Sequence, residues 1–187
     1  MSKILVDTID TRSGTTNLTI GSTNSSTVTF ENGAVTGHMY PAFSVKASSD
    51  QTGIADNAIT LVQLNSEDYD TDSAFNTSTY KFTVPSGQAG KYFFYGQVSI
   101  KGTSGADRRS MYVWLYKNGS GFSKSGYFLY DKHFEGSQEN VPCIARTFDL
   151  SVGDTIELRA QCFDGSSGTY IINGNTNTYL TGYRIGT

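Results

Sequence analysis

The sequence predicts an all-β protein, and three observations carry this prediction. The 187 residues include 20 glycines, 12 tyrosines and 11 phenylalanines, a composition typical of short strands joined by many turns. Apolar and polar side chains alternate over short stretches, and no stretch sustains the period of a helix. Glycine- and asparagine-rich turn signals separate these stretches, which favours a β-sandwich or jelly roll.

The net charge and the start of the chain exclude several classes of partner. A formal net charge of −3 indicates no basic surface for nucleic acid or anionic lipid. No apolar run approaches the length of a membrane span. Residues 1–7 reach an acidic residue at once and lack a small-residue cleavage site, so they do not resemble a signal peptide. We therefore expect no membrane insertion and no nucleic-acid partner.

Residues 1–38 form the first predicted region, which is rich in Ser, Thr, Asn and Gly. Short alternating stretches at 17–20 and 27–30 each lead into a glycine or Asn-Gly turn. So few apolar side chains cannot form a core within one chain. The composition alone is typical of a flexible linker, whereas the alternation favours an ordered β-rich stalk with its core between chains. The candidate anchor residues are Ile4, Val6, Ile9, Leu18 and Ile20.

Residues 39–187 form the second predicted region, a head built from strands. The expected strands are 41–47, 58–64, 80–84, 91–100, 108–116, 144–150, 155–161, 170–172 and 179–185. The dipeptide Asn118-Gly119 is a hairpin signal. Residues 120–140 are expected to form a long segment rich in glycine and aromatic side chains.

The strand expected at 91–100 carries large side chains on both faces. Alternation places Tyr92 and Phe94 on one face and Phe93 and Tyr95 on the other. Such a strand must be covered twice, by a facing sheet and, most simply, by another subunit. The candidate residues of the core and of a seam between subunits are Tyr92, Phe94 and Tyr95.

Two cysteines, Cys143 and Cys162, flank an expected hairpin of residues 144–150 and 155–161. The alternation places the two cysteines on opposite faces, so only a bulge would bring them together. Two free, packed thiols are therefore expected, and a disulfide is the alternative.

The sequence contains no motif for catalysis or metal binding that is specific enough to assign. His38 and His133 belong to no zinc or hydrolase motif, so no catalytic residue, metal or cofactor is expected. The acidic run 67–72 is interpreted as a solvated loop, with a calcium site as the alternative. Asp154 is expected to be a turn residue after Gly153. Sequence spacing pairs no two carboxylates for glycan hydrolysis, so an enzyme is not favoured.

Aromatic side chains between residues 120 and 140 are the best candidates for recognition. Aromatic residues on loops provide a large contact area at low entropic cost. The alternative is that these side chains cover a flank of the sandwich or lie in the seam between subunits. Trp114, in the middle of a strand, is expected in the core. The candidate receptor-binding residues are Tyr127, Phe128, Tyr130, His133 and Phe134.

Six motifs in order give the head region a resemblance to a known family. They lie at residues 41–44, 65–75, 82–94, 115–119, 148–158 and 179–185. In order and spacing they resemble the globular head domain of complement component 1q and its tumour-necrosis-factor-like relatives. The resemblance implies a ten-strand jelly-roll β-sandwich that assembles as a homotrimer and binds partners through loops and outer faces. Residues 9–21 are similar to segments in tail- and head-fibre proteins of bacteriophages, notably marine ones.

These features together predict a bacteriophage virion structural protein, a trimeric fibre, knob or decoration protein. Residues 1–38 would contact other virion proteins, and the head would bind a glycan or protein on the host-cell surface. The protein would be made in the host cytoplasm without a signal peptide and would be located in the virion. The first alternative is a free soluble binding module, lectin- or cytokine-like, and the less favoured one is a glycan-active enzyme.

Overall fold

Strands make up the regular structure of the part of the chain that the structure describes. The computed structural model describes residues 41–102, 110–128, 139–163, 168–174 and 177–186, in which the chain forms 14 strands. No helix in these ranges is long and apolar enough to cross a membrane. The all-β prediction is confirmed.

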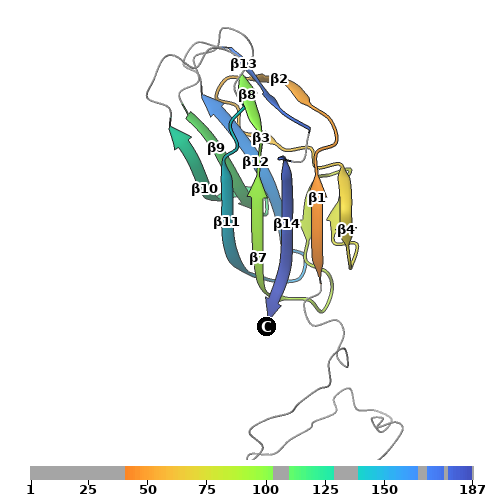
Figure 1. The fold of residues 1–187 in the computed structure, drawn as a ribbon. Coiled ribbons are helices and arrows are strands. Elements are labelled where there is room, and N and C mark those ends of the chain that lie inside the picture. Colours follow the sequence, from red (N-terminus) through yellow and green to blue (C-terminus); the bar gives the residue numbers. More distant parts are fainter. Residues whose placement is uncertain (1–40, 103–109, 129–138, 164–167, 175–176, 187) are drawn as a thin grey trace, which may run out of the picture. The chain divides into compact units, whose positions relative to one another are not determined.

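Two antiparallel sheets packed face to face form a sandwich, seen from its five-stranded side in Figure 1. The five-stranded sheet contains, in spatial order, β11 (Cys143–Leu150), β7 (Gly90–Gln97), β14 (Tyr179–Gly186), β1 (Ala42–Lys46) and β4 (Ser66–Asp70). The other sheet contains β10 (Ser120–Phe128), β9 (Ser110–Lys117), β12 (Thr155–Phe163), β6 (Lys81–Thr83) and β5 (Phe75–Asn76), with β3 (Thr60–Leu61) also paired to β12.

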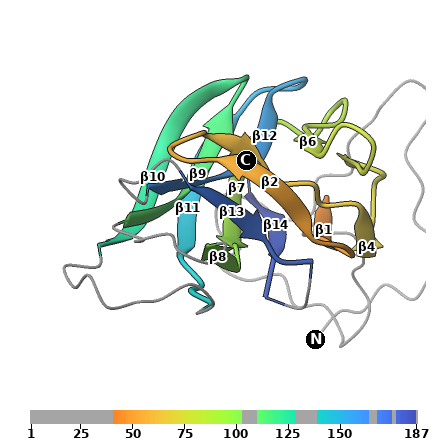
Figure 2. The ribbon, with the colours of Figure 1, turned by 90° about the horizontal axis from the view of Figure 1, so that it is seen from above.

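A small third sheet lies at one end of the sandwich, as the view from above in Figure 2 shows. Its strands, in spatial order, are β2 (Gln51–Ala55), β13 (Thr169–Ile172) and β8 (Ile100–Gly102). The hydroxyl of buried Tyr170 in β13 donates to the carbonyl oxygens of Ala58 at 2.8 Å and Ala160 at 3.2 Å. These hydrogen bonds attach the small sheet to the second sheet of the sandwich, because Ala160 lies in β12.

Aromatic rings fill the core between the two large sheets. Phe82 of β6 is fully buried, and its ring centroid lies 5.1 Å from that of Phe43 and 5.3 Å from that of Phe94. The ring of Tyr92 lies 5.5 Å from the same phenylalanine. Phe82 thus packs across the sandwich against β1 and β7. Tyr92 and Phe94 therefore lie in the core of a single chain rather than on its surface.

The turn between β9 and β10 is formed by Asn118 and Gly119, as the hairpin signal predicts. Their φ angles are 51° and 75°, and residues 117 and 120 face each other across the turn. Two consecutive positive φ values are typical of the tight hairpin turn that matches the strand twist. The strand after the turn extends to Phe128, so the first part of the segment 120–140 is a strand rather than an irregular loop.

The prediction that β11 and β12 form a hairpin is wrong. β11 pairs with β7 in the first sheet, and β12 pairs with β9 in the second. The intervening turn carries the chain from one sheet to the other. The apolar alternation on both strands is explained by burial, because Phe148 of β11 and Leu158 of β12 both belong to the core between the sheets.

The acidic stretch interpreted as a loop contains an edge strand. Residues 66–70 form β4, whose one partner among the described strands is β1. Asp68 is ion-paired to Lys46, and this hydrogen bond lowers the pKa of the Asp68 carboxyl below its ordinary value. Asp70 accepts backbone N–H groups of Ala74 at 3.1 Å and Phe75 at 2.7 Å. Charged side chains on an edge strand oppose pairing with a further chain.

Asp154 is a turn residue, as predicted. Its carboxylate accepts the backbone N–H of Ser151 at 2.9 Å and the side-chain amide of Asn118 at 2.8 Å. It also pairs with the ammonium group of Lys117 at 2.8 Å. The side chain thus ties the turn after β11 to the β9–β10 hairpin. Hydrogen bonds from Asn118 and Lys117 lower the pKa of Asp154 to about 2 from the ordinary value of 3.8.

Acidification from pH 4 to pH 2 is expected to remove the stabilisation that Asp154 provides. Because its pKa is lower in the folded chain than in the unfolded chain, the contribution is complete above pH 3.8 and disappears as the pH falls through about 2. The expected size is on the order of 1–2 kcal/mol. The free energy of unfolding of the native chain and of Asp154→Asn, measured against pH, should converge near pH 2. A difference that stays constant over this range would contradict the assignment.

Candidate functional site

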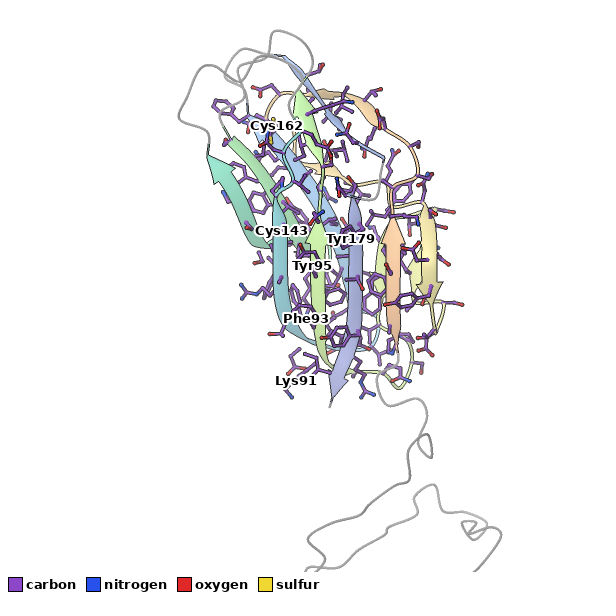
Figure 3. The ribbon with its side chains drawn as sticks, viewed as in Figure 1. Lys91, Phe93, Tyr95, Cys143, Cys162 and Tyr179 are labelled. Atoms are coloured by element: carbon purple, nitrogen blue, oxygen red, sulfur yellow. The ribbon has the colours of Figure 1, made fainter. Side chains whose placement is uncertain are left out.

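The outward side of the five-stranded sheet is the candidate functional site, and we call it the front face. Figure 3 shows Phe93 and Tyr95 along β7, with Tyr179 on the neighbouring β14. These side chains are half-buried in a single chain, whereas Tyr92 and Phe94 of the same strand are fully buried on its inner side. The front face is defined by Phe93, Tyr95, Gln97, Cys143, Ala145, Thr147, Tyr179, Thr181 and Tyr183.

Strand register brings the aromatic residues of the front face together. Phe93 and Tyr183 are directly opposite in the β7–β14 pair, with ring centroids 5.5 Å apart. Tyr95 and Tyr179 are diagonal neighbours in the same pair, with centroids 5.8 Å apart. Cross-strand aromatic pairs stabilise a sheet even where it is open to solvent. The two tilted pairs together form an aromatic stripe along β7 and β14.

No residue that defines the front face is charged. Charged side chains lie next to it: Lys91 is the second residue of β7, Asp149 lies near the end of β11, and Lys46 lies on β1 and is paired with Asp68. Arg146 lies between Ala145 and Thr147 in β11, the outer strand of this sheet. Protein interfaces have this composition, with tyrosine enriched and charge depleted at the centre and a polar rim. The front face is therefore chemically suited to be buried against another protein surface.

Small side chains of β11 leave the front face uneven. Ala145 and Thr147 lie opposite Tyr95 and Phe93, and an open hollow of about 460 Å³ is lined by Phe93, Ala145, Arg146 and Thr147. A neighbouring surface could place a side chain in this hollow, because complementary interfaces interdigitate like protein interiors. The front face thus has an uneven shape, as well as an uncharged aromatic centre, that a partner surface could match.

Tyr95 is the polar centre of the stripe. Its hydroxyl donates to the side-chain carbonyl of Gln97 at 3.1 Å. Burial, followed by a hydrogen bond to Cys143, raises the pKa of the Tyr95 hydroxyl above its ordinary value. The hydroxyl is therefore neutral at physiological pH and can be covered without burying a charge.

Neither cysteine forms a disulfide, as predicted, and the two differ in exposure. Cys143 is exposed on the front face and Cys162 is buried in the core. An alkylating reagent is expected to leave Cys162 unmodified in the native protein, because buried thiols are inert. If the front face is an interface, modification of Cys143 should become slower as the protein concentration rises. Peptide mass spectrometry after timed labelling checks both expectations, and equal rates for the two cysteines would contradict the burial of Cys162.

The structure describes only two of the residues that the sequence marks as recognition candidates. Tyr127 and Phe128 belong to β10, where they pair with Met111 and Ser110 of β9. Tyr130, His133 and Phe134 lie outside the described residues, as do the anchor candidates Ile4, Val6, Ile9, Leu18 and Ile20. The receptor-binding and anchor assignments thus stay predictions.

Sequence reasoning missed several residues of the front face. It identified Tyr95, but it did not select Phe93, Tyr179 or Tyr183 as seam residues. A usable signal was present, since Tyr179 and Tyr183 alternate with Leu180, which is buried. Alternation marks two faces of a strand, but it does not state which face another chain covers.

The acidic residues considered for catalysis have structural partners. Glu157 is fully buried and pairs with Lys81 and Arg159, each at 2.8 Å. Although burial opposes ionisation, hydrogen bonds from these two cations lower the pKa of Glu157. A carboxylate held ionised between two cations is not suited to act as a general acid.

Trp114 is not in the core, which corrects the sequence-based expectation. The buried apolar residues of β9 are Met111, Val113 and Leu115, and Trp114 alternates with them, as do Tyr112 and Tyr116, so it lies on the opposite side of the strand. Its ring centroid lies 6.1 Å from that of Tyr116, with the ring planes 72° apart. The outward side of the second sheet thus carries aromatic residues of its own.

Comparison with solved structures identifies the fold. The globular domain of zebrafish complement 1qA protein matches with a TM-score of 0.52 and 21% identity, over 78% of this chain and 97% of that one. Murine APRIL at pH 5.0 matches with a TM-score of 0.55 and 12% identity, over 78% and 98% of the two chains. Eiger TNF from S. frugiperda matches with a TM-score of 0.52 and 10% identity, over 78% and 94%.

No protein-family model and no curated protein sequence matches the chain. The chain has the jelly-roll fold of complement 1q and tumour-necrosis-factor-like globular heads, as the resemblance implies.

Proposed function

We propose that three copies of this chain assemble through their front faces into a homotrimer that acts as a binding head and has no catalytic role. The observation that carries the proposal is the uncharged aromatic centre of the front face, which is only half-buried in one chain. Contiguous apolar patches on monomeric proteins commonly mark interaction sites. The fold supports the same proposal, because heads of this type typically form homotrimers and bind partners without catalysis.

The finer proposal is that the trimer is a bacteriophage virion protein, a fibre knob or a decoration protein. Its support is the sequence of residues 9–21, which resembles segments of phage fibre proteins and precedes the head region. In this role residues 1–38 attach the trimer to other virion proteins, and the head contacts the host-cell surface. Three heads on one attachment raise the effective concentration of each weak contact.

A free soluble binding module is the second candidate. The observation in its favour is that structural neighbours include a complement domain and an insect TNF. Both candidates require the same trimer, but they differ in where the trimer is found.

Electron microscopy of bacteriophage particles, labelled with a gold-conjugated antiserum against the full chain, distinguishes the virion protein from the free binding module. Labels at discrete sites on intact particles, retained after gradient purification, are expected for a virion protein. Recovery of all antigen in the particle-free fraction of the lysate would contradict the virion role and favour the free module. Antiserum that is first saturated with an excess of soluble full-length protein provides the blocking control, because it should no longer label the particles.

A further inference from the structure

The outward side of the second sheet carries an ordered aromatic row that the proposed trimer does not use. Tyr112, Trp114 and Tyr116 alternate along β9, and their half-buried side chains point away from the core residues between them. We call these three residues the aromatic row. The front face belongs to the other sheet of the sandwich, so assembly through that face does not require the row.

Glycines of the neighbouring strand make room for the two tyrosines. Gly126 is paired with Tyr112, and a side chain at position 126 would begin 2.1 Å from Tyr112 Cδ1. Gly121 is paired with Tyr116, whose ring atoms lie 3.4 Å from the place where a side chain would begin. The Tyr112 ring thus occupies the space that a side chain at position 126 would need, whereas the Tyr116 ring lies in ordinary contact with Gly121. This arrangement keeps the rings over the sheet surface rather than directed into solvent.

Two cations flank the row. The ammonium of Lys124, from β10, lies 4.3 Å from the ring centroid of Tyr112 and 4.9 Å from that of Trp114. The guanidinium of Arg159, from β12, lies 4.4 Å from the ring centroid of Tyr116. Register places Lys124 and Arg159 on opposite sides of Trp114. The central tryptophan therefore stands between two positive charges.

The row has a positive charge balance and a donor without an acceptor. Glu157 is shared by Lys81 and Arg159, and in the described ranges no carboxylate lies within ion-pair distance of Lys124. The indole Nε1–H of Trp114 is shielded from solvent and has no hydrogen-bond partner among the described residues. A buried donor without an acceptor costs free energy in the unliganded protein. A ligand that supplied an acceptor to this N–H group would remove that cost.

We propose that the aromatic row binds an acidic saccharide, with sugar rings packed on the aromatic side chains and a carboxylate of the ligand paired with Lys124. Aromatic side chains with polar edges suit ligands that are apolar on one face and hydrogen-bonding at their rim. The positive balance around Lys124 selects an anion. The inference rests on the proposed function in one respect, namely that the head is a binding module.

An acidic peptide and a second copy of the chain fit the row less well. A peptide that adds to a sheet needs an unpaired strand edge, and β9 is paired on both sides, with β10 and β12. A second copy using the same row would bring Lys124 close to Lys124, and like charges across an interface are unfavourable. A saccharide needs neither a free edge nor a negatively charged protein surface.

Tryptophan fluorescence of the full-length protein tests the proposal directly, because Trp114 is the only tryptophan in the chain. The probe is an alginate hexasaccharide, in which every sugar is a uronic acid, and the matched neutral probe is maltohexaose. We expect saturable quenching or a spectral shift with the acidic probe alone, weakened by added sodium chloride because salt screens exposed charges. Lys124→Gln is expected to weaken binding about tenfold, in line with the loss of one charge-assisted contact. Lys101→Gln, a lysine of the third sheet, should bind like the native chain.

Each other outcome overturns a stated part of the proposal. Equal responses to the acidic and neutral hexasaccharides would contradict selection of an anion. A response to hexaglutamate as strong as that to the acidic saccharide would contradict the choice of a saccharide. No response to any probe would exclude the site. An emission that changes with protein concentration alone would assign the aromatic row to self-association. Light scattering in the same buffers keeps the two proposals distinct, because a monomer that binds the saccharide refutes only the trimer, and a trimer that does not bind refutes only the site.

Discussion

Replacing Phe82 by alanine is expected to lower the free energy of unfolding by about 3–5 kcal/mol, the range for removing a large buried aromatic side chain. Phe82 has no exposed surface, and its ring packs against Phe43, Phe94 and Tyr92 across the sandwich. Its loss leaves a cavity that rings held by two different strands cannot readily fill. Urea denaturation followed by circular dichroism measures the effect, at one fixed protein concentration because association also stabilises the folded chain.

Phe122→Ala is the matched control for this prediction. Phe122 is 51% exposed, although its ring lies 4.9 Å from that of Phe148. We expect a loss of about 1 kcal/mol or less, as for a partly exposed side chain. Equal losses in the two variants would contradict the placement of Phe82 at the centre of the core.

Replacing Tyr95 by arginine is expected to convert the proposed trimer into folded monomers. Tyr95 lies in the middle of the front face, none of whose defining residues is charged, and its ring centroid lies 5.8 Å from that of Tyr179. Burying three unpaired guanidinium groups, one from each copy, would oppose association by several kcal/mol. The half-buried position of Tyr95 in one chain lets the arginine reach solvent in the monomer, so the fold should survive. Light scattering gives the mass, and circular dichroism checks the fold.

Tyr112→Arg provides the control on the opposite side of the sandwich. Tyr112 is also a half-buried tyrosine in a long strand, but it points outward from the second sheet. This variant removes a similar ring and adds the same charge, so it should retain the mass of the native protein. Dissociation of both variants to the same extent would mean that the front face is not the specific interface.

Local sequence features identified the strands and turns because their causes are local. The alternation that places Tyr92 and Phe94 in the core on one side of β7 reports burial of a pleated strand, and two-residue spacing is enough to recognise it. The Asn118-Gly119 turn is likewise determined by the positive φ values that these two residues tolerate. Such features could be predicted without knowledge of the rest of the chain.

The pairing of strands could not be predicted in the same way. The turn at Asp154 has the residues of a hairpin turn, yet β11 and β12 belong to different sheets. A tight turn fixes only the local chain reversal, whereas the partner of each strand depends on which distant strands complete the two sheets. The hydrogen bonds of the turn, from Asn118 and Lys117 to Asp154, involve a hairpin more than 30 residues away in sequence.

Two further errors came from treating residue type as a guide to burial. Trp114 is large and apolar, but it alternates with the core residues Val113 and Leu115 and therefore lies on the outer side. The run 67–72 is acidic, but its first residues form the edge strand β4, in which both faces can contact water. Strand parity would have placed the tryptophan correctly, whereas nothing in the local sequence shows that β4 is an edge.

The mass of the full-length protein in solution, measured by light scattering, tests the central claim of front-face assembly most directly. The account predicts three times the chain mass of 20.3 kDa, unchanged over a range of micromolar concentrations. A mass of 20.3 kDa under the same conditions would contradict it, because the aromatic stripe of the front face would then be stable while uncovered.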